Sequence, residues 1–138
     1  MSLAPILAAG IAVQIHLVSV LIAFAIGTWM MVRPKGTAPH KALGRTYVAL
    51  MVVSAVSTFW IRGLGHGSLS FLHLLSIFVL LALPFAIVMA RLGRVRAHRY
   101  TMIGVYLGGI WIAGLLTLLP GRLLHRAVFG SVLGPIEP

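Results

Sequence analysis

The first apolar run of the chain decides the fold class. Residues 2–32 read SLAPILAAGIAVQIHLVSVLIAFAIGTWMMV, and none of them is charged. The run ends at residues 33–36, which read RPKG and bring two bases, a proline and a glycine together. A helix that crosses the hydrocarbon core of a bilayer needs about 20 predominantly apolar residues. The stretch therefore predicts a transmembrane helix over residues 5–32.

Three more apolar runs follow, each bounded by charge, proline or glycine, and they predict spans at 42–61, 68–90 and 100–119. The short loops between them allow only antiparallel neighbours. We therefore predict an all-α fold, an integral membrane four-helix bundle that forms a single transmembrane domain over residues 1–138. The segment 121–130 separates apolar from basic positions on a helical wheel and predicts a short C-terminal interfacial helix.

Composition supports this class and excludes several kinds of chemistry. Of the 138 residues, 60% are hydrophobic and only 9% are charged. A soluble domain usually carries about a quarter of its residues as charged side chains. The chain has no cysteine, which excludes thiolate metal sites, and its single acidic residue, Glu137, excludes paired-carboxylate hydrolysis. The composition does not decide whether the protein is an enzyme, and we predict no catalytic residue.

The basic residues predict the orientation in the membrane. Of the eleven Lys and Arg residues, eight follow the first and third apolar runs: Arg33, Lys35, Lys41, Arg45, Arg91, Arg94, Arg96 and Arg99. The positive-inside bias then places these segments in the cytoplasm and both termini outside, in the inner (plasma) membrane of a cell. The net charge of +10 flanks apolar spans rather than a soluble domain. We therefore expect anionic lipid headgroups as partners, and no nucleic acid.

The chain also contains an internal repeat. His16 begins the sequence HLVSV, and His73 begins the similar sequence HLLSI. Gly36 and Gly93 each lie 20 residues after these histidines (36 − 16 and 93 − 73). A further histidine follows at +24 in the first half and at +25 in the second. The pattern predicts two duplicated hairpins related by an axis along the membrane normal.

Such a repeat places equivalent histidines at equal depth. His16 and His73 would share one level, and His40 and His98 a second level near the cytoplasmic edge. Two facing neutral imidazoles are the iron ligands that a b-type haem needs, so we predict haem iron between His16 and His73. Supporting residues are expected to orient these rings, admit a flat macrocycle or neutralise its propionates: Ser19, Ser76, Gly27, Arg45 and Arg99.

Each feature also has a plainer interpretation. The membrane histidines can act as interhelical hydrogen-bond glue, and the pair near the membrane edge can be interfacial anchors. Gly104 and Gly108 form a GxxxG pattern, which favours close packing against another helix of the chain, a second copy or a partner membrane protein. The function is then either cofactor-based electron transfer in the membrane or a non-catalytic accessory role in a larger respiratory or photosynthetic complex. Without an intramembrane carboxylate, ion-coupled transport is disfavoured.

Four segments carry a family resemblance. They are residues 35–47, KGTAPHKALGRTY; 71–76, FLHLLS; 97–106, AHRYTMIGVY; and 119–122, LPGR. In these segments the chain resembles a bacterial family of small four-helix membrane proteins of unknown function, over essentially its whole length. The resemblance implies four spans and family-wide use of the four helix histidines, and it supplies no activity. A looser similarity, resting on paired histidines at two depths, is to dihaem b-type cytochromes of the ascorbate-reductase or ferric-reductase type.

Overall fold

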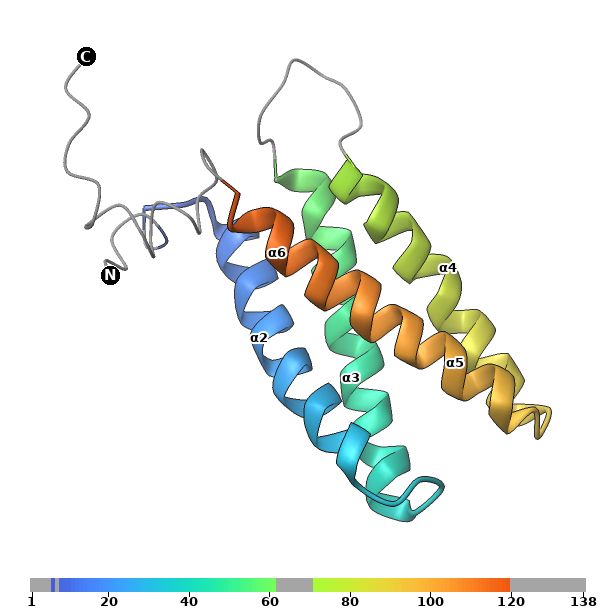
Figure 1. Cartoon of the computed structure of the whole chain (residues 1–138). Helices are drawn as coiled ribbons and strands as arrows, with labels where there is room; N and C mark the ends of the chain where they lie inside the picture. Colours follow the sequence, from blue (N-terminus) through green and yellow to red (C-terminus); the bar gives the residue numbers. More distant parts are fainter. Residues whose placement is uncertain (1–5, 7, 62–70, 120–138) are drawn as a thin grey trace, which may run out of the picture.

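The computed structural model describes residues 6, 8–61 and 71–119, and its regular elements there are all helical (Figure 1). The all-α prediction is therefore confirmed for this part of the chain. The predicted interfacial segment 121–130 lies outside the described residues. The elements, in chain order, are α2 (Ile11–Val32), α3 (Ala38–Ser57), the 3-10 turn η1 (Thr58–Trp60), α4 (Phe71–Arg91), α5 (Val95–Tyr106), the π-helical turn η2 (Leu107–Ile112) and α6 (Ala113–Thr117).

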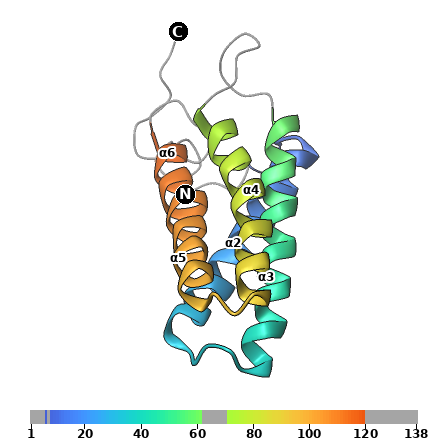
Figure 2. The same cartoon turned by 90° about the vertical axis from the view of Figure 1, so that its right-hand side faces the viewer.

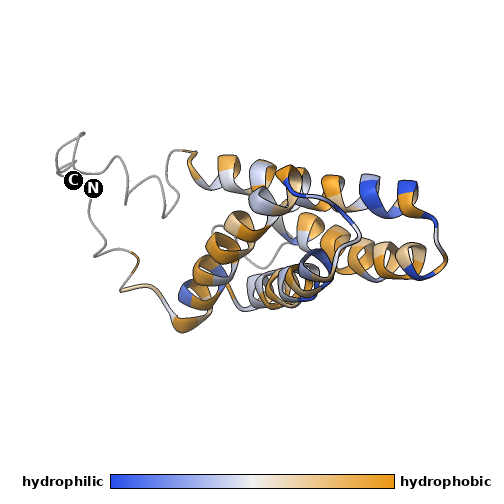
Figure 3. Ribbon diagram, turned by 90° about the horizontal axis from the view of Figure 1, so that it is seen from below, coloured by the Kyte–Doolittle hydropathy of each residue, from blue (hydrophilic) through white to orange (hydrophobic). Residues whose placement is uncertain are grey.

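Four helical segments are long and apolar enough to cross a bilayer. The first, α2, has 22 residues and is about 33 Å long at 1.5 Å per residue, against about 30 Å of hydrocarbon. α5, η2 and α6 run on as one continuous fourth span. Large apolar side chains point outward from these spans, as Leu81 does with 69% of its surface exposed. Figure 3 shows apolar residues over most of the helices, as a lipid-facing surface requires.

The helices extend beyond the spans that hydropathy predicts at the basic segments. α3 begins at Ala38 rather than at residue 42, and α5 begins at Val95 rather than at residue 100. At the first of these starts, the Thr37 hydroxyl caps the helix by accepting a hydrogen bond from the His40 amide at 3.3 Å. Hydropathy marks where a chain leaves hydrocarbon, whereas a capped helix continues into the headgroup layer. Lys41 and Arg45 therefore lie on α3, and Arg96 and Arg99 on α5, rather than in loops.

The two hairpins turn in the same way. Gly36, between α2 and α3, has φ +81°, and Gly93, between α4 and α5, has φ +71°. These left-handed conformations favour glycine because it has no Cβ. Both turns lie at one end of the bundle, which we call the loop end (Figure 1). The repeat identified in the sequence thus recurs as equivalent backbone geometry at equivalent positions.

The bundle places α4 between α3 and the fourth span, with α2 behind (Figure 2). Its core contains Met51, Leu83 and Val105, the largest of the fully buried side chains. Gly108 faces α4, since a Cβ at that position would lie 3.5 Å from the Phe78 ring. Gly104 lies beside the same ring, at 4.0 Å. The GxxxG pattern therefore packs against a helix of the same chain.

α2 meets the fourth span at a close contact that depends on glycine. A Cβ on Gly27 would lie 2.7 Å from Cδ2 of Tyr106 and 3.0 Å from Cε2 of Tyr47. The Tyr106 hydroxyl lies 2.6 Å from the Thr28 hydroxyl. Tyr106 is therefore held against α2 twice, by its ring at Gly27 and by its hydroxyl at Thr28. Gly27 was expected to admit a macrocycle, but the space that it leaves is filled by the Tyr106 ring. We call this contact the tyrosine notch.

Replacing Gly27 with alanine should destabilise the bundle, because the new methyl group collides with a ring held by a hydrogen bond. We expect Gly27→Ala to lower the free energy of unfolding by about 1–3 kcal/mol, the usual cost of overpacking. The matched control is Gly44→Ala, whose Cβ would meet Cε of Met30 at an ordinary 3.6 Å. The control should be neutral or stabilising by up to about 1 kcal/mol, the helix-propensity gain. Unfolding in detergent measures both, and equal stability of the two variants would contradict the prediction.

Candidate functional site

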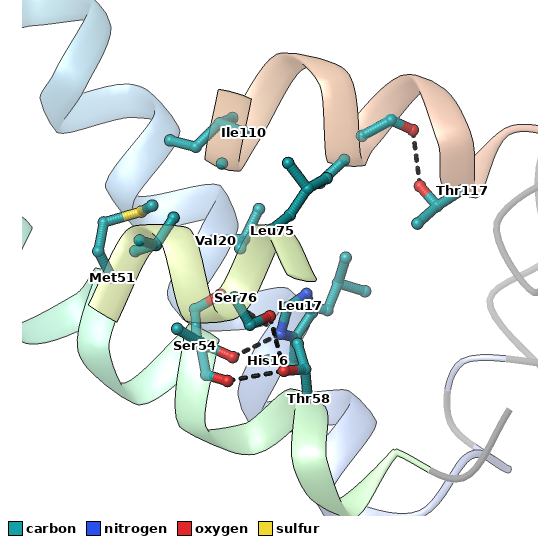
Figure 4. A pocket seen from close by; sticks show the side chains of 15 residues that line it. His16, Leu17, Val20, Met51, Ser54, Thr58, Leu75, Ser76, Ile110 and Thr117 are labelled. Carbon is teal, nitrogen blue, oxygen red and sulfur yellow. Dashed lines mark hydrogen bonds between the residues drawn. The ribbon is translucent and has the colours of Figure 1, made fainter. Parts of the chain in front are cut away.

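The His16 ring is held by the neighbouring helix. Its Nδ1 lies 2.9 Å from the carbonyl oxygen of Ser54, 3.3 Å from the Ser54 hydroxyl and 3.2 Å from the Ser57 hydroxyl. A carbonyl oxygen can only accept, so the 2.9 Å contact requires the hydrogen to be on Nδ1. Nε2 then carries a free lone pair. In Figure 4 this second ring nitrogen points away from the hydrogen bonds that fix the first.

The register of the first hairpin brings these groups together. His16 lies 16 residues before Val32, the end of α2 (32 − 16), and Ser54 lies 16 residues after Ala38, the start of α3 (54 − 38). Residues equally far from the turn of an antiparallel hairpin stand at the same height. The serines of α3 were not among the predicted site residues. Counting from the turn in both directions would have found Ser54.

His16 lines a cavity in the half of the bundle farther from the loop end. Its volume is about 120 Å³, and all four spans contribute to its wall. Most of the wall is apolar or small, as with Ala55, Gly109 and Gly114. A hydroxyl pair bridges η1 and α4 there, because Thr58 donates to Ser76 at 2.8 Å. The cavity is thus mainly apolar, with polar groups concentrated near His16 (Figure 4).

The π-helical turn η2 forms another part of the wall. Gly109 and Ile110 of η2 line the cavity. A Cβ on Gly109 would lie 2.8 Å from Cγ2 of Val79 and 3.0 Å from Cε of Met51, so glycine is needed for this approach. π-helical turns within α-helices occur often at functional sites. Hydropathy does not reveal such a turn, because it changes hydrogen bonding and not composition.

His73 is placed differently from its repeat partner. Its ring packs against Phe59 with centroids 5.7 Å apart, and it is not among the residues that line the cavity. Ser76 does line the cavity, whereas Ser19 is buried elsewhere on α2. The structure therefore brings His16 and Ser76 to one cavity but does not bring His16 and His73 to it.

His40 and His98, the second pair of predicted histidines, lie at the loop end. His98 is bonded through Nδ1 to the carbonyl oxygen of Ala86 on α4, at 2.9 Å. His40 instead lines a surface groove between α2 and α3, within electrostatic reach of His98. Arg45, the eighth residue of α3, and Arg99, the fifth residue of α5, are both exposed. In residues 6, 8–61 and 71–119, no group of three or more metal-ligating side chains occurs.

The bond network at His16 predicts a measurable coupling between two helices. The effects of His16→Ala and Ser57→Ala should be non-additive, because the Ser57 hydroxyl lies 3.2 Å from His16 Nδ1 and donates to the same Ser54 carbonyl oxygen. Interhelical hydrogen bonds in membranes average about 0.6 kcal/mol in such cycles, with a maximum near 1.7. The cycle is measured from unfolding free energies in detergent. A parallel cycle of Ser57→Ala with His98→Ala, at the other end of the bundle, should be additive. Additivity in the first cycle as well would contradict the assignment.

Comparison with known proteins gives a family and no activity. No curated protein and no solved structure matches the chain. The similarity to dihaem cytochromes accordingly stays a prediction. One family match covers residues 13–129, which include all four helix histidines, and its description is "Predicted membrane protein (DUF2306)". The chain belongs to this family of membrane proteins of unknown function.

Proposed function

We propose that this membrane protein binds a b-type haem in the His16 cavity and transfers electrons within the bilayer. The observation that carries the proposal is the orientation of His16. Its Nδ1 donates to Ser54 and its Nε2 lone pair is left free. Metal-ligating histidines are commonly oriented in this way, with the other ring nitrogen donating to a carbonyl. When bound, a haem would supply one-electron chemistry at its iron.

The chemistry of the wall supports a hydrophobic cofactor. The cavity is lined by residues of all four spans, and no Lys or Arg is among them. Cofactor sites are typically concave and apolar, with a few well-placed polar groups. Ser76 of α4 and Thr58 of η1 provide such groups.

The volume of the cavity sets a condition on the proposal. At about 120 Å³ it is smaller than the roughly 300–1,000 Å³ of sites that hold drug-sized ligands. A porphyrin therefore does not fit at the present helix separation. Binding would require the helices around the cavity to separate. For His73 to hold the group together with His16, its ring would have to leave Phe59.

The small volume favours a second candidate function. If His16 serves only as the hydrogen-bonding link between α2 and α3, its geometry needs no cofactor. The protein would then be a non-catalytic accessory subunit of a larger membrane complex. The Gly104 and Gly108 face would not be free for a partner helix, because Phe78 of α4 covers it.

Absorbance of the purified protein distinguishes the two functions. After expression with excess haem, the haem proposal expects a Soret band that shifts on reduction with dithionite. His16→Ala should abolish the band. The matched control is Ile15→Ala, a neighbouring change on a side chain that is 44% exposed to the surroundings, and it should leave the band unchanged.

Two results would overturn the haem proposal. A folded, colourless wild-type protein would contradict haem binding and favour the accessory role. A Soret band that persists in folded His16→Ala would exclude His16 as the ligand. Circular dichroism and gel filtration of each variant in detergent show whether the bundle is intact.

A further inference from the structure

A groove of about 470 Å³ lies at the loop end, between the end of α2 and the start of α3. One part of its lining is apolar and comprises Trp29, Met30 and Leu43. Another part is polar or basic and includes Arg33 and His40. The groove lies where two membrane spans end. It therefore extends from the level of the lipid acyl chains to the level of the lipid headgroups. We call it the loop groove.

Arg33 is held at the groove by an aromatic ring. Its guanidinium carbon lies 4.2 Å from the centroid of the Trp29 ring, a cation–π distance. Stacking occupies a face of the guanidinium plane and leaves the N–H donors at its edge free. These edge donors match the oxygen atoms of a phosphate.

His40 supplies a second group that is free to bind. Its ring makes no hydrogen bond with the described part of the chain, although its backbone amide bonds to Thr37. The repeat provides an internal comparison, because His98 of the second hairpin is bonded to the carbonyl of Ala86. Ala86 is the repeat equivalent of Trp29, offset by the same 57 residues as His73 from His16 (86 − 29 and 73 − 16). The first hairpin therefore has the Trp29 indole and a His40 ring without a hydrogen bond. At the corresponding places the second hairpin has the Ala86 methyl group and a His98 ring that is hydrogen-bonded.

The electrostatics of the loop groove favour an anion. Lys35 and Lys41 lie beside it in the chain, and the sole acidic residue of the protein is Glu137. No carboxylate within residues 6, 8–61 and 71–119 neutralises Arg33. The positive charge at the loop groove would therefore be balanced by a bound anion.

From these observations we infer that the loop groove is a binding site for one anionic glycerophospholipid. Its phosphate contacts Arg33 and His40, and its acyl chains lie against Trp29 and Leu43. The source is the bilayer rather than free phosphate, because most of the residues that line the groove are apolar. The inference does not depend on the haem proposal, since His16 lies at the other end of α2.

Fluorescence of Trp29 tests the site directly. The protein carries Trp60→Phe and Trp111→Phe, so that Trp29 is the remaining tryptophan, and is reconstituted in phosphatidylcholine vesicles. A minor fraction of brominated lipid, either phosphatidylglycerol or phosphatidylcholine, then quenches the indole on contact. We expect the anionic quencher to bind at least about fivefold more strongly, the effect of one basic side chain near a membrane surface.

Two further variants separate a site from general surface charge. The double variant Arg33→Gln with His40→Gln should lose the preference for the anionic lipid, so that the two brominated lipids bind about equally. Arg91→Gln with Arg94→Gln removes basic charge from the other hairpin and should leave it unchanged. Equal quenching by the two lipids in the parent protein would overturn the inference. A similar loss in both double variants would also overturn it, because the preference would then follow net charge alone. Inorganic phosphate should not relieve the quenching, and relief would contradict a lipid ligand.

Discussion

Hydrocarbon offers no hydrogen-bond partner, and the arrangement of this molecule follows from that constraint. The backbone satisfies it by forming helices throughout the spans. Several polar side chains inside the bundle satisfy it by reaching another helix, as His16 does at Ser54, Thr58 at Ser76 and Tyr106 at Thr28. The buried Tyr47 hydroxyl is an exception, since it has no hydrogen-bond partner within the described residues. Association of apolar helices gains little from the hydrophobic effect in lipid, so such links and close glycine contacts hold the spans together. The site at His16 is one of these links.

The two halves of the chain share a backbone plan but use it differently. Gly36 and Gly93 turn alike, yet His16 lines the interior cavity and His73 packs on Phe59. His98 is bonded to Ala86, whereas His40 faces a groove beside Trp29. The two hairpins thus turn alike, while the residues around each histidine differ and change what it contacts. A membrane protein built this way can keep one histidine for structure while its equivalent serves a ligand.

The sequence was sufficient for the four apolar spans and the all-α class, because these depend on hydropathy and on the spacing of charged and breaking residues. It was insufficient for rotation of the helices about their axes. Whether His73 faces the cavity or Phe59 depends on the rotation of α4. Whether Tyr106 or a cofactor fills the space at Gly27 depends on the rotations of α2 and the fourth span. Ser54 could have been found from the hairpin register. The π-helical turn at Leu107–Ile112 could not, since no residue type specifies it.

The tyrosine notch also bears on how the protein is made. The chain is synthesised from its N-terminus, so α2 and α3 exist before Tyr106 has been translated. Until the fourth span is added, the Tyr106 ring is absent from Gly27 and the Thr28 hydroxyl lacks its link to that span. The last span to be synthesised therefore completes the packing of the first.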